Sequence, residues 1–94
     1  EVLGVLLLAH KYQKPIWPHA GGVGLCEYVQ HISMIDYLLI SCEKNSKRIE
    51  YVDHLHEHFI NPCKINDGKY MAPLEPGFSI EMKHETFTNF LHLK

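Results

Sequence analysis

The chain has 94 residues, 46% of them hydrophobic and 21% charged, which is the composition of one small globular domain and excludes a disordered segment. The formal net charge of −2 gives no basic surplus, so we expect no nucleic-acid partner. Eight histidines make the net charge sensitive to pH between about 5 and 7.

Residues 1–11 are predicted to form the end of a mostly buried helix, which Pro15 follows. One face of this helix carries Leu3, Leu6, Leu7 and His10. The apolar run is too short for a membrane span, and it has neither the basic front nor the cleavage site of a signal peptide, so we expect no membrane partner. Because the chain begins inside a helical pattern and without Met, we expect it to be a piece of a longer protein.

The segment 16–24 places His19 at the end of a short extended piece and follows it with Gly21, Gly22 and Gly24. A strand end would hold the imidazole, the glycines would leave space above it, and histidine exchanges protons near neutral pH. His19 is therefore a candidate catalytic residue. Two other interpretations stay open at this point. The histidine could only cap a strand-to-helix turn, or the glycines could bind a phosphate, although their GGxG spacing is not that of a P-loop.

Residues 23–40 carry apolar side chains at steps of three and four, which predicts the longest helix of the chain. Its end, residues 37–41, is apolar throughout and is also compatible with a strand. A polar loop is expected over 42–47 and a short strand over 48–52. This alternation of helices and buried strands is typical of βα units in a parallel sheet or barrel, and it predicts an α/β fold.

Glu50 lies on the last of these short strands. A carboxylate there can face a ligand, since sites in α/β folds gather at the carboxyl ends of the strands. A solvated surface glutamate is the alternative. Asp36, and Cys26 next to Glu27, are interpreted as structural.

Three histidines in one short run, His54, His56 and His58, raise the question of a metal site. The run lacks the HExxH motif, and the three cysteines of the chain contain no CxxC pair that would complete a tetrahedral set. We therefore predict a polar helix whose histidines have local partners, and no metal ligands in this chain. An odd number of cysteines without disulfide-framework spacing favours a reducing intracellular compartment.

The pattern changes in the last third of the chain, where Asp67-Gly68 separates two strand-like arms over 64–71 and predicts a β-hairpin. An irregular stretch follows, marked by Pro73, Pro76 and Gly77.

Several sequence blocks occur in order and at compatible spacing. They are PHAGGVGLCE (18–27), VQH (29–31), IEYVDHLH (49–56), GKYMAP (68–73) and PGFSIEM (76–82). Together they resemble the sugar-acid dehydratases of the enolase superfamily, of the L-fuconate dehydratase type, over about residues 1–85.

The resemblance implies a modified TIM barrel that carries the chemistry and an α+β capping domain that closes over the substrate. Residues 1–53 are then expected to be the last βα units of the barrel. Residues 54–85 would be a hairpin-containing C-terminal segment that packs on the barrel and returns to the capping domain, and residues 86–94 a divergent tail. Apolar faces that neighbouring barrel units would cover are expected to be exposed in this chain alone.

The resemblance also implies a Mg²⁺-dependent lyase that converts L-fuconate to 2-keto-3-deoxy-L-fuconate, by removing the proton next to the carboxylate and eliminating the β-hydroxyl. It makes His19 the acid that helps the hydroxyl leave, and it gives Glu50 a contact with the sugar-acid substrate or its enediolate. The base lysine, three carboxylate ligands of Mg²⁺ and the aspartate that orients the histidine are expected upstream of Glu1. The isolated chain is therefore expected to be inactive.

Two alternatives to an enzyme fragment stay open. One is a non-catalytic truncated product, and the other is a histidine-rich module that binds a metal or a partner through residues 54–58. The resemblance favours a mitochondrial location, with the cytoplasm as the alternative, and the sequence leaves the oligomeric state open.

Overall fold

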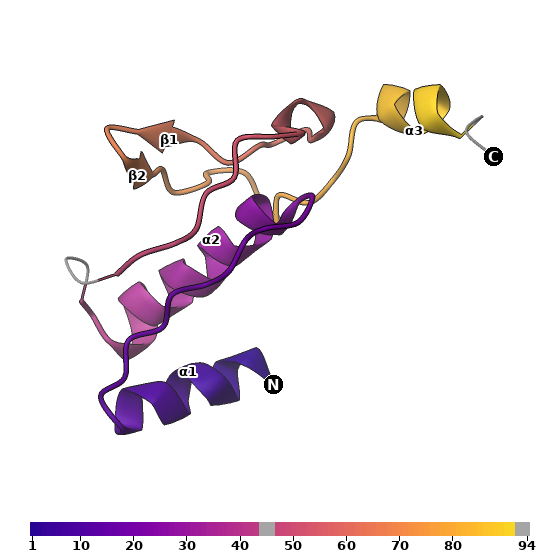
Figure 1. The fold of residues 1–94 in the computed structure, drawn as a ribbon. Helices are drawn as coiled ribbons and strands as arrows, with labels where there is room; N and C mark the ends of the chain where they lie inside the picture. The colour runs from indigo at the N-terminus through magenta and orange to yellow at the C-terminus, as the bar shows by residue number, and fades with distance from the viewer. Residues whose placement is uncertain (44–46, 92–94) are drawn as a thin grey trace.

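The computed structural model describes residues 1–43 and 47–91 (Figure 1). Residues 44–46 of the predicted loop 42–47 and residues 92–94 of the predicted tail 86–94 lie outside the described residues. The elements in chain order are α1 (Val2–Lys11), α2 (Leu25–Ile35), the π-helical turn η1 (Asp36–Ile40), the 3₁₀ turn η2 (His56–His58), β1 (Ile65–Asn66), β2 (Lys69–Tyr70) and α3 (His84–Phe90).

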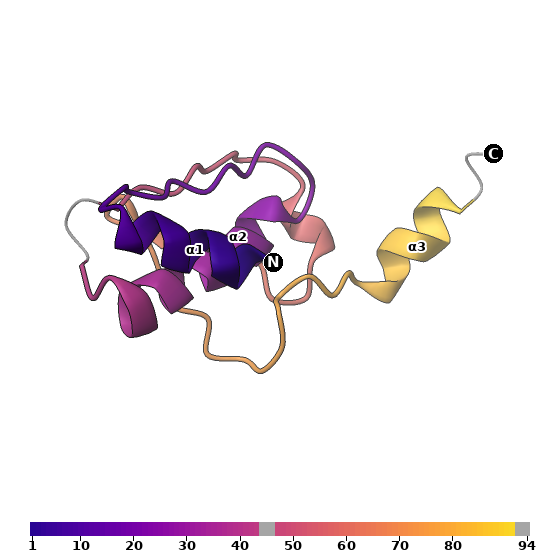
Figure 2. The same ribbon diagram turned by 90° about the horizontal axis from the view of Figure 1, so that it is seen from below.

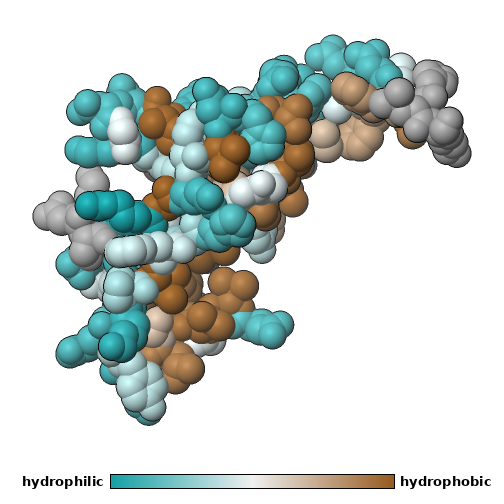
Figure 3. Space-filling model, viewed as in Figure 1, coloured by the Kyte–Doolittle hydropathy of each residue, from teal (hydrophilic) through white to brown (hydrophobic). Residues whose placement is uncertain are grey.

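The first helix, α1, confirms the predicted helix but not its predicted burial. Only Leu6 is buried, whereas Leu3 and Leu7 are each about half exposed. Within the described residues α1 packs on one side only, against η1, and a shallow groove lined by α2 residues from Tyr28 to Ile35 and by Phe78 runs along the same side (Figure 2). Apolar side chains consequently gather at the surface over α1 (Figure 3), as the sequence analysis expected for faces that neighbouring barrel units would cover.

The second helix, α2, begins two residues later than predicted, because Gly24 has a φ of +73°. That left-handed conformation cannot belong to a right-handed helix, and it is available to glycine at little cost. The alternative of a strand over 37–41 is wrong. The chain instead continues as η1, where the backbone N–H and the hydroxyl of Ser41 both donate to the carbonyl of Asp36, at 2.8 and 3.2 Å.

Two extended segments, 15–20 and 48–53, run side by side along α2 (Figures 1 and 2). They are joined by a backbone hydrogen bond from Glu50 N–H to the carbonyl of Pro18, at 3.2 Å. Neither segment is a regular strand in the described part of the chain, so the strand predicted over 48–52 is wrong for this chain. Proline is one reason, because Pro15 and Pro18 have no N–H to donate to a ladder.

The predicted hairpin is confirmed. Ile65 pairs with Tyr70 and Asn66 with Lys69 in an antiparallel ladder. The two turn residues, Asp67 and Gly68, have φ of +51° and +69°, which is the geometry of the type I′ turn that Asp-Gly favours.

A small core lies between α2, the two extended segments and the hairpin. It consists of Ala20, Cys26, Val29 and Cys63, with Ile32, Ile49, Val52 and Tyr70 packed around it. The C-terminal α3 projects away from this core (Figures 1 and 2). The radius of gyration is accordingly 15.0 Å, against about 12 Å for a compact domain of this length. No helix in the described ranges is both long and apolar enough to span a membrane.

Candidate active site

The structure brings together the two residues that the sequence singled out for catalysis and substrate contact. His19, at the end of one extended segment, forms an ion pair through Nδ1 with Oε2 of Glu50, on the other. The His19 side chain is 80% exposed and that of Glu50 41%, so both groups are open to a ligand. The pair is 31 positions apart in sequence and depends on the side-by-side path of the two segments.

Glu50 is held at three points. Its carboxylate accepts a hydrogen bond from the backbone N–H of Ala20 at 2.6 Å, its own N–H donates to Pro18, and its carbonyl accepts the hydroxyl of Tyr70 at 2.5 Å. Tyr70 belongs to β2, so the hairpin fixes the backbone of Glu50 from behind. Sequence reasoning missed this role of Tyr70, because only the folded chain brings the hairpin to residue 50.

Gly21 provides the space in which the imidazole lies. A Cβ atom at this position would stand 2.7 Å from Cε1 and 3.0 Å from Nε2 of His19, closer than real Cβ contacts. The first glycine of the motif therefore leaves room for the ring, as the sequence predicted. A phosphate bound by the glycines would need free backbone N–H groups at the start of α2. The N–H of Leu25 already donates to the carbonyl of Gly22 at 3.0 Å, which argues against phosphate binding there.

With Nδ1 on the glutamate, Nε2 of His19 is the ring nitrogen left for a ligand, and it lies over Gly21 in a side chain that is 80% exposed. A carboxylate on one ring nitrogen holds the imidazole in a fixed orientation, and histidine exchanges protons near neutral pH. The arrangement can deliver a proton from Nε2 to a group above it, which is general-acid chemistry.

Mg²⁺ requires several oxygen ligands, and the site does not supply them. The carboxylate in contact with His19 is that of Glu50, and its Oε2 already accepts from two groups. Among the described residues, the one group of three neighbouring candidate ligands is Cys26, His56 and Cys63, whose sulfur atoms do not suit Mg²⁺. The residues of this chain therefore do not form a magnesium site by themselves.

A buried polar cluster lies behind the pair. The carboxylate of Glu27, on α2, is fully buried and accepts a hydrogen bond from Nδ1 of His56 at 2.5 Å, and Nε2 of His56 donates to the carbonyl of Val52 at 2.7 Å. Burial lowers the pKa of His56, but these hydrogen bonds outweigh it and raise the pKa above its usual value. Burial and the nearby Glu27 carboxylate raise the pKa of the Cys63 thiol to about 12.

The other residues that the sequence singled out are structural or lie apart from the pair. Asp36 is buried and forms an ion pair with Lys47 at 2.6 Å. The three histidines of residues 54–58 do not converge. His54 is exposed, and His58 lies 3.2 Å from the hydroxyl of Thr86. Of the predicted polar helix only the 3₁₀ turn His56–His58 forms, and the partners are mostly distant in sequence: Val52 is local to His56, whereas Glu27 and Thr86 are not.

Comparison with known proteins places the chain in a family. The family model described as "Enolase C-terminal domain-like" matches residues 1–86. The chain belongs to this family. The resemblance to the enolase superfamily inferred from the sequence blocks is therefore confirmed.

Individual relatives agree with this placement. The chain is 52% identical over 90 residues to Mitochondrial enolase superfamily member 1 of Xenopus laevis, and 54% identical over 90 residues to L-galactonate dehydratase of Hypocrea jecorina. Each match covers 96% of this chain and 20% of the relative. The crystal structure of human Mitochondrial enolase superfamily member 1 matches with a TM-score of 0.88 and 53% identity, over 92% of this chain and 20% of that one.

The chain thus has the fold of the matched part of that crystal structure and spans about a fifth of its relatives' length. The expected assignment of residues 1–53 to the last barrel units, 54–85 to the segment that returns to a capping domain, and 86–94 to a tail remains a prediction. The helix α3, which the sequence pattern did not predict, crosses the boundary between the last two ranges.

Proposed function

We propose that this chain is the C-terminal part of a sugar-acid dehydratase in which His19 is the general acid. The observation that carries the proposal is the ion pair between His19 Nδ1 and Glu50, which leaves Nε2 open to a substrate. The name of one relative, L-galactonate dehydratase, supports elimination of water from a sugar acid as the reaction class. L-Fuconate is the substrate that the sequence resemblance implies.

In the proposed reaction, a base outside this chain removes the proton on the carbon next to the carboxylate. The electron pair of that C–H bond becomes the new C=C bond of the enol, and the β C–O bond breaks. His19 Nε2 gives its proton to the departing hydroxide, which leaves as water, and the enol becomes the 2-keto-3-deoxy acid. Glu50 pairs with the protonated imidazole before the transfer and holds the ring in place.

Glu50 therefore has a positioning role in addition to the substrate contact implied by the resemblance. The resemblance gives the orientation of the histidine to an aspartate outside this chain, whereas here a carboxylate of the chain itself lies on Nδ1. The Ala20 N–H bond to Oε2 at 2.6 Å keeps this carboxylate directed at the ring. Mg²⁺, which the resemblance implies, would stabilise the enediolate, and its ligands are expected outside this chain.

A chimera tests the proposal. The chain would replace the segment that it matches in human Mitochondrial enolase superfamily member 1, and release of 2-keto-3-deoxy product would be measured with L-fuconate and L-galactonate in the presence of Mg²⁺. We expect turnover by the chimera, a loss of about 10²–10⁴-fold in kcat for His19→Asn, and a smaller loss for Glu50→Gln. The exposed His54→Asn, away from the pair, is the matched control and should retain full activity.

The proposal fails if His19→Asn retains a kcat within a few-fold of the unmodified chimera while circular dichroism shows that it is folded. The 94-residue chain alone should release no product, because the base is outside it. The names of several relatives support a mitochondrial location for the parent protein, which imaging of a tagged full-length protein would test.

A further inference from the structure

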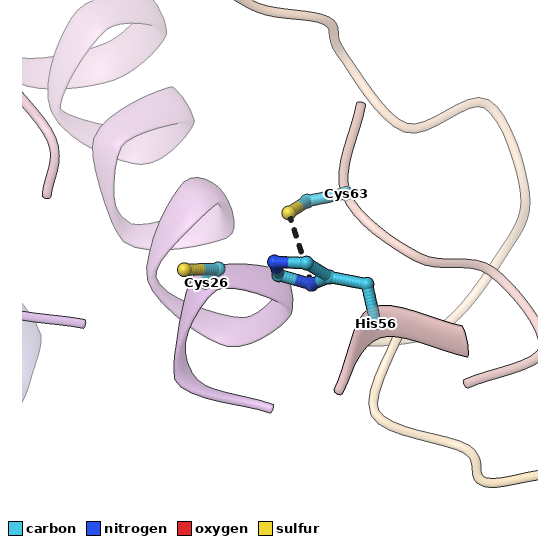
Figure 4. A group of neighbouring side chains, drawn as sticks. All are labelled: Cys26, His56 and Cys63. Atoms are coloured by element: carbon cyan, nitrogen blue, oxygen red, sulfur yellow. Dashed lines mark hydrogen bonds between the residues drawn. The ribbon is translucent and has the colours of Figure 1, made fainter. Parts of the chain in front are cut away.

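Three side chains with metal-binding atoms meet in the core behind the active-site pair. The sulfur atoms of Cys26 and Cys63 and a ring nitrogen of His56 all lie within 4.8 Å of one another (Figure 4). They come from three separate parts of the chain: α2, η2 and the loop that leads into β1. The proposed dehydratase chemistry uses none of them.

The geometry points to a structural site for a thiophilic divalent cation of the Zn²⁺ class, held by Cys26, His56 and Cys63. Two thiolates and an imidazole select zinc over magnesium or calcium, which prefer oxygen. Three such ligands leave one position of a tetrahedral zinc site to a fourth donor, and the carboxylate of Glu27 lies beside the group without belonging to it. This inference is independent of the proposed function.

The ligand atoms are almost close enough together to bind one zinc ion. Zn–S bonds of about 2.3 Å and Zn–N bonds of about 2.0 Å place tetrahedral ligand atoms about 3.5–3.8 Å apart. Nδ1 of His56 is already 3.8 Å from Sγ of Cys63. The other separations, at most 4.8 Å, need to shorten by about 1 Å, which is within the reach of side-chain rotation.

A second observation points to a missing cation at this place. Oε2 of Glu27 is buried and has no hydrogen-bond partner, and its side chain is 1% exposed. A buried carboxylate oxygen without a partner is costly, because it has lost its hydration and gained no interaction in exchange. Its other oxygen lies 2.5 Å from Nδ1 of His56, so the carboxylate is next to the proposed ligands.

The surroundings supply the outer contacts that metal ligands require. Both ring nitrogens of His56 have acceptors, Glu27 and the Val52 carbonyl, so whichever nitrogen takes the cation, the other keeps a partner that fixes the ring. The backbone N–H of Val52 donates to Sγ of Cys26 at 3.4 Å, which stabilises a thiolate. Metal binding would release the thiol protons to solvent.

The proposed site would stabilise the backbone near the active-site pair. Sγ of Cys26 lies 3.7 Å from the carbonyl of Ala20 and 3.8 Å from that of Val52. These residues stand next to His19 and two positions after Glu50. These two contacts are donated by the Cys26 thiol and would be lost with its proton, whereas the bond from the Val52 N–H to Sγ would remain. A cation on Cys26, His56 and Cys63 would therefore tie α2 to η2, to the loop before the hairpin and, through Val52, to the second extended segment.

Cobalt spectroscopy on the reduced, metal-free 94-residue chain tests the site, because Co²⁺ replaces Zn²⁺ in tetrahedral thiolate sites and absorbs visible light. We expect sulfur-to-cobalt charge-transfer absorption that saturates at one equivalent of Co²⁺ and disappears when Zn²⁺ is added. Cys26→Ala and Cys63→Val should abolish it. Cys42→Ala, which removes the exposed cysteine, is the matched control and should leave it unchanged.

A second measurement needs no variant. Zn²⁺ should slow alkylation of Cys26 and Cys63 at least tenfold, as read by mass spectrometry of each peptide, and should leave the rate at Cys42 unchanged. The inference is overturned if equimolar Co²⁺ gives no tetrahedral spectrum, if the spectrum survives in Cys63→Val or depends on Cys42, or if Zn²⁺ protects neither buried cysteine. The last result would mean that the cluster is a hydrogen-bonded thiol core without a metal.

Discussion

Gly24 gives the sharpest test of how this fold is held together, because its structural requirement has two separable parts. Its φ of +73° is unfavourable for any residue with a Cβ, at a cost of about 1–2 kcal/mol. A Cβ there would also stand 2.9 Å from Cζ of Phe59, whose ring is buried. Displacing a packed ring costs about 1–3 kcal/mol more. Gly24→Ala should therefore lower the free energy of unfolding by about 2–5 kcal/mol in total.

Two other glycines provide matched controls. Gly68 has a φ of +69° with no atom within 4 Å of the added Cβ, so Gly68→Ala carries only the backbone cost of about 1–2 kcal/mol. Gly4 lies inside α1 with nothing near the added Cβ, and Gly4→Ala should stabilise the chain by about 0.5–1 kcal/mol. Urea unfolding followed by circular dichroism measures all three substitutions on one scale.

A double substitution isolates the contact with the ring. Phe59→Leu destabilises by itself, but it removes the ring atoms that the methyl group introduced by Gly24→Ala would meet. The two changes together should therefore cost less than their individual costs added, with a coupling of about 1–3 kcal/mol. The reasoning is refuted if Gly24→Ala costs no more than Gly68→Ala, or if the coupling is zero within error.

Other contacts lead to shorter tests. Gly21→Ala should lower kcat of the chimera by about 10–100-fold, because its Cβ would lie 2.7 Å from Cε1 of His19 and move the ring; an unchanged kcat would contradict this. Tyr70→Phe should lower the free energy of unfolding of the chimera by about 1 kcal/mol, as measured by urea unfolding, because it removes the hydrogen bond to the carbonyl of Glu50. An effect below roughly 0.3 kcal/mol would contradict this bond. In the metal-free chain, the Cys63 thiol, with its pKa raised to about 12, stays protonated at pH 8, so iodoacetamide should alkylate the exposed Cys42 at least tenfold faster; equal rates by mass spectrometry would argue against the buried thiol.

Local sequence patterns were sufficient where a feature depends on neighbouring residues. The apolar side chains at steps of three and four in residues 25–35 correctly predicted α2, and Asp67-Gly68 correctly predicted a hairpin, whose turn is of type I′. Both features depend on interactions between residues a few positions apart. The apolar run 37–41 has no period, and its π-helical conformation could not be read from it. The burial of α1 was also predicted wrongly, since burial depends on which segments pack against a helix, and the described residues cover only one side of α1.

For the candidate site too, some features followed from local sequence and others only from the folded chain. The blocks around His19 and Glu50 were enough to place the chain in its family and to choose both residues, because their motifs are local. Three relations arose only in the folded chain: the ion pair between these two residues, the bond from Tyr70, and the group of Cys26, His56 and Cys63. Each joins positions between 7 and 37 residues apart that share no motif. Sequence determined which side chains were available, and the packing of distant segments on α2 decided which of them meet.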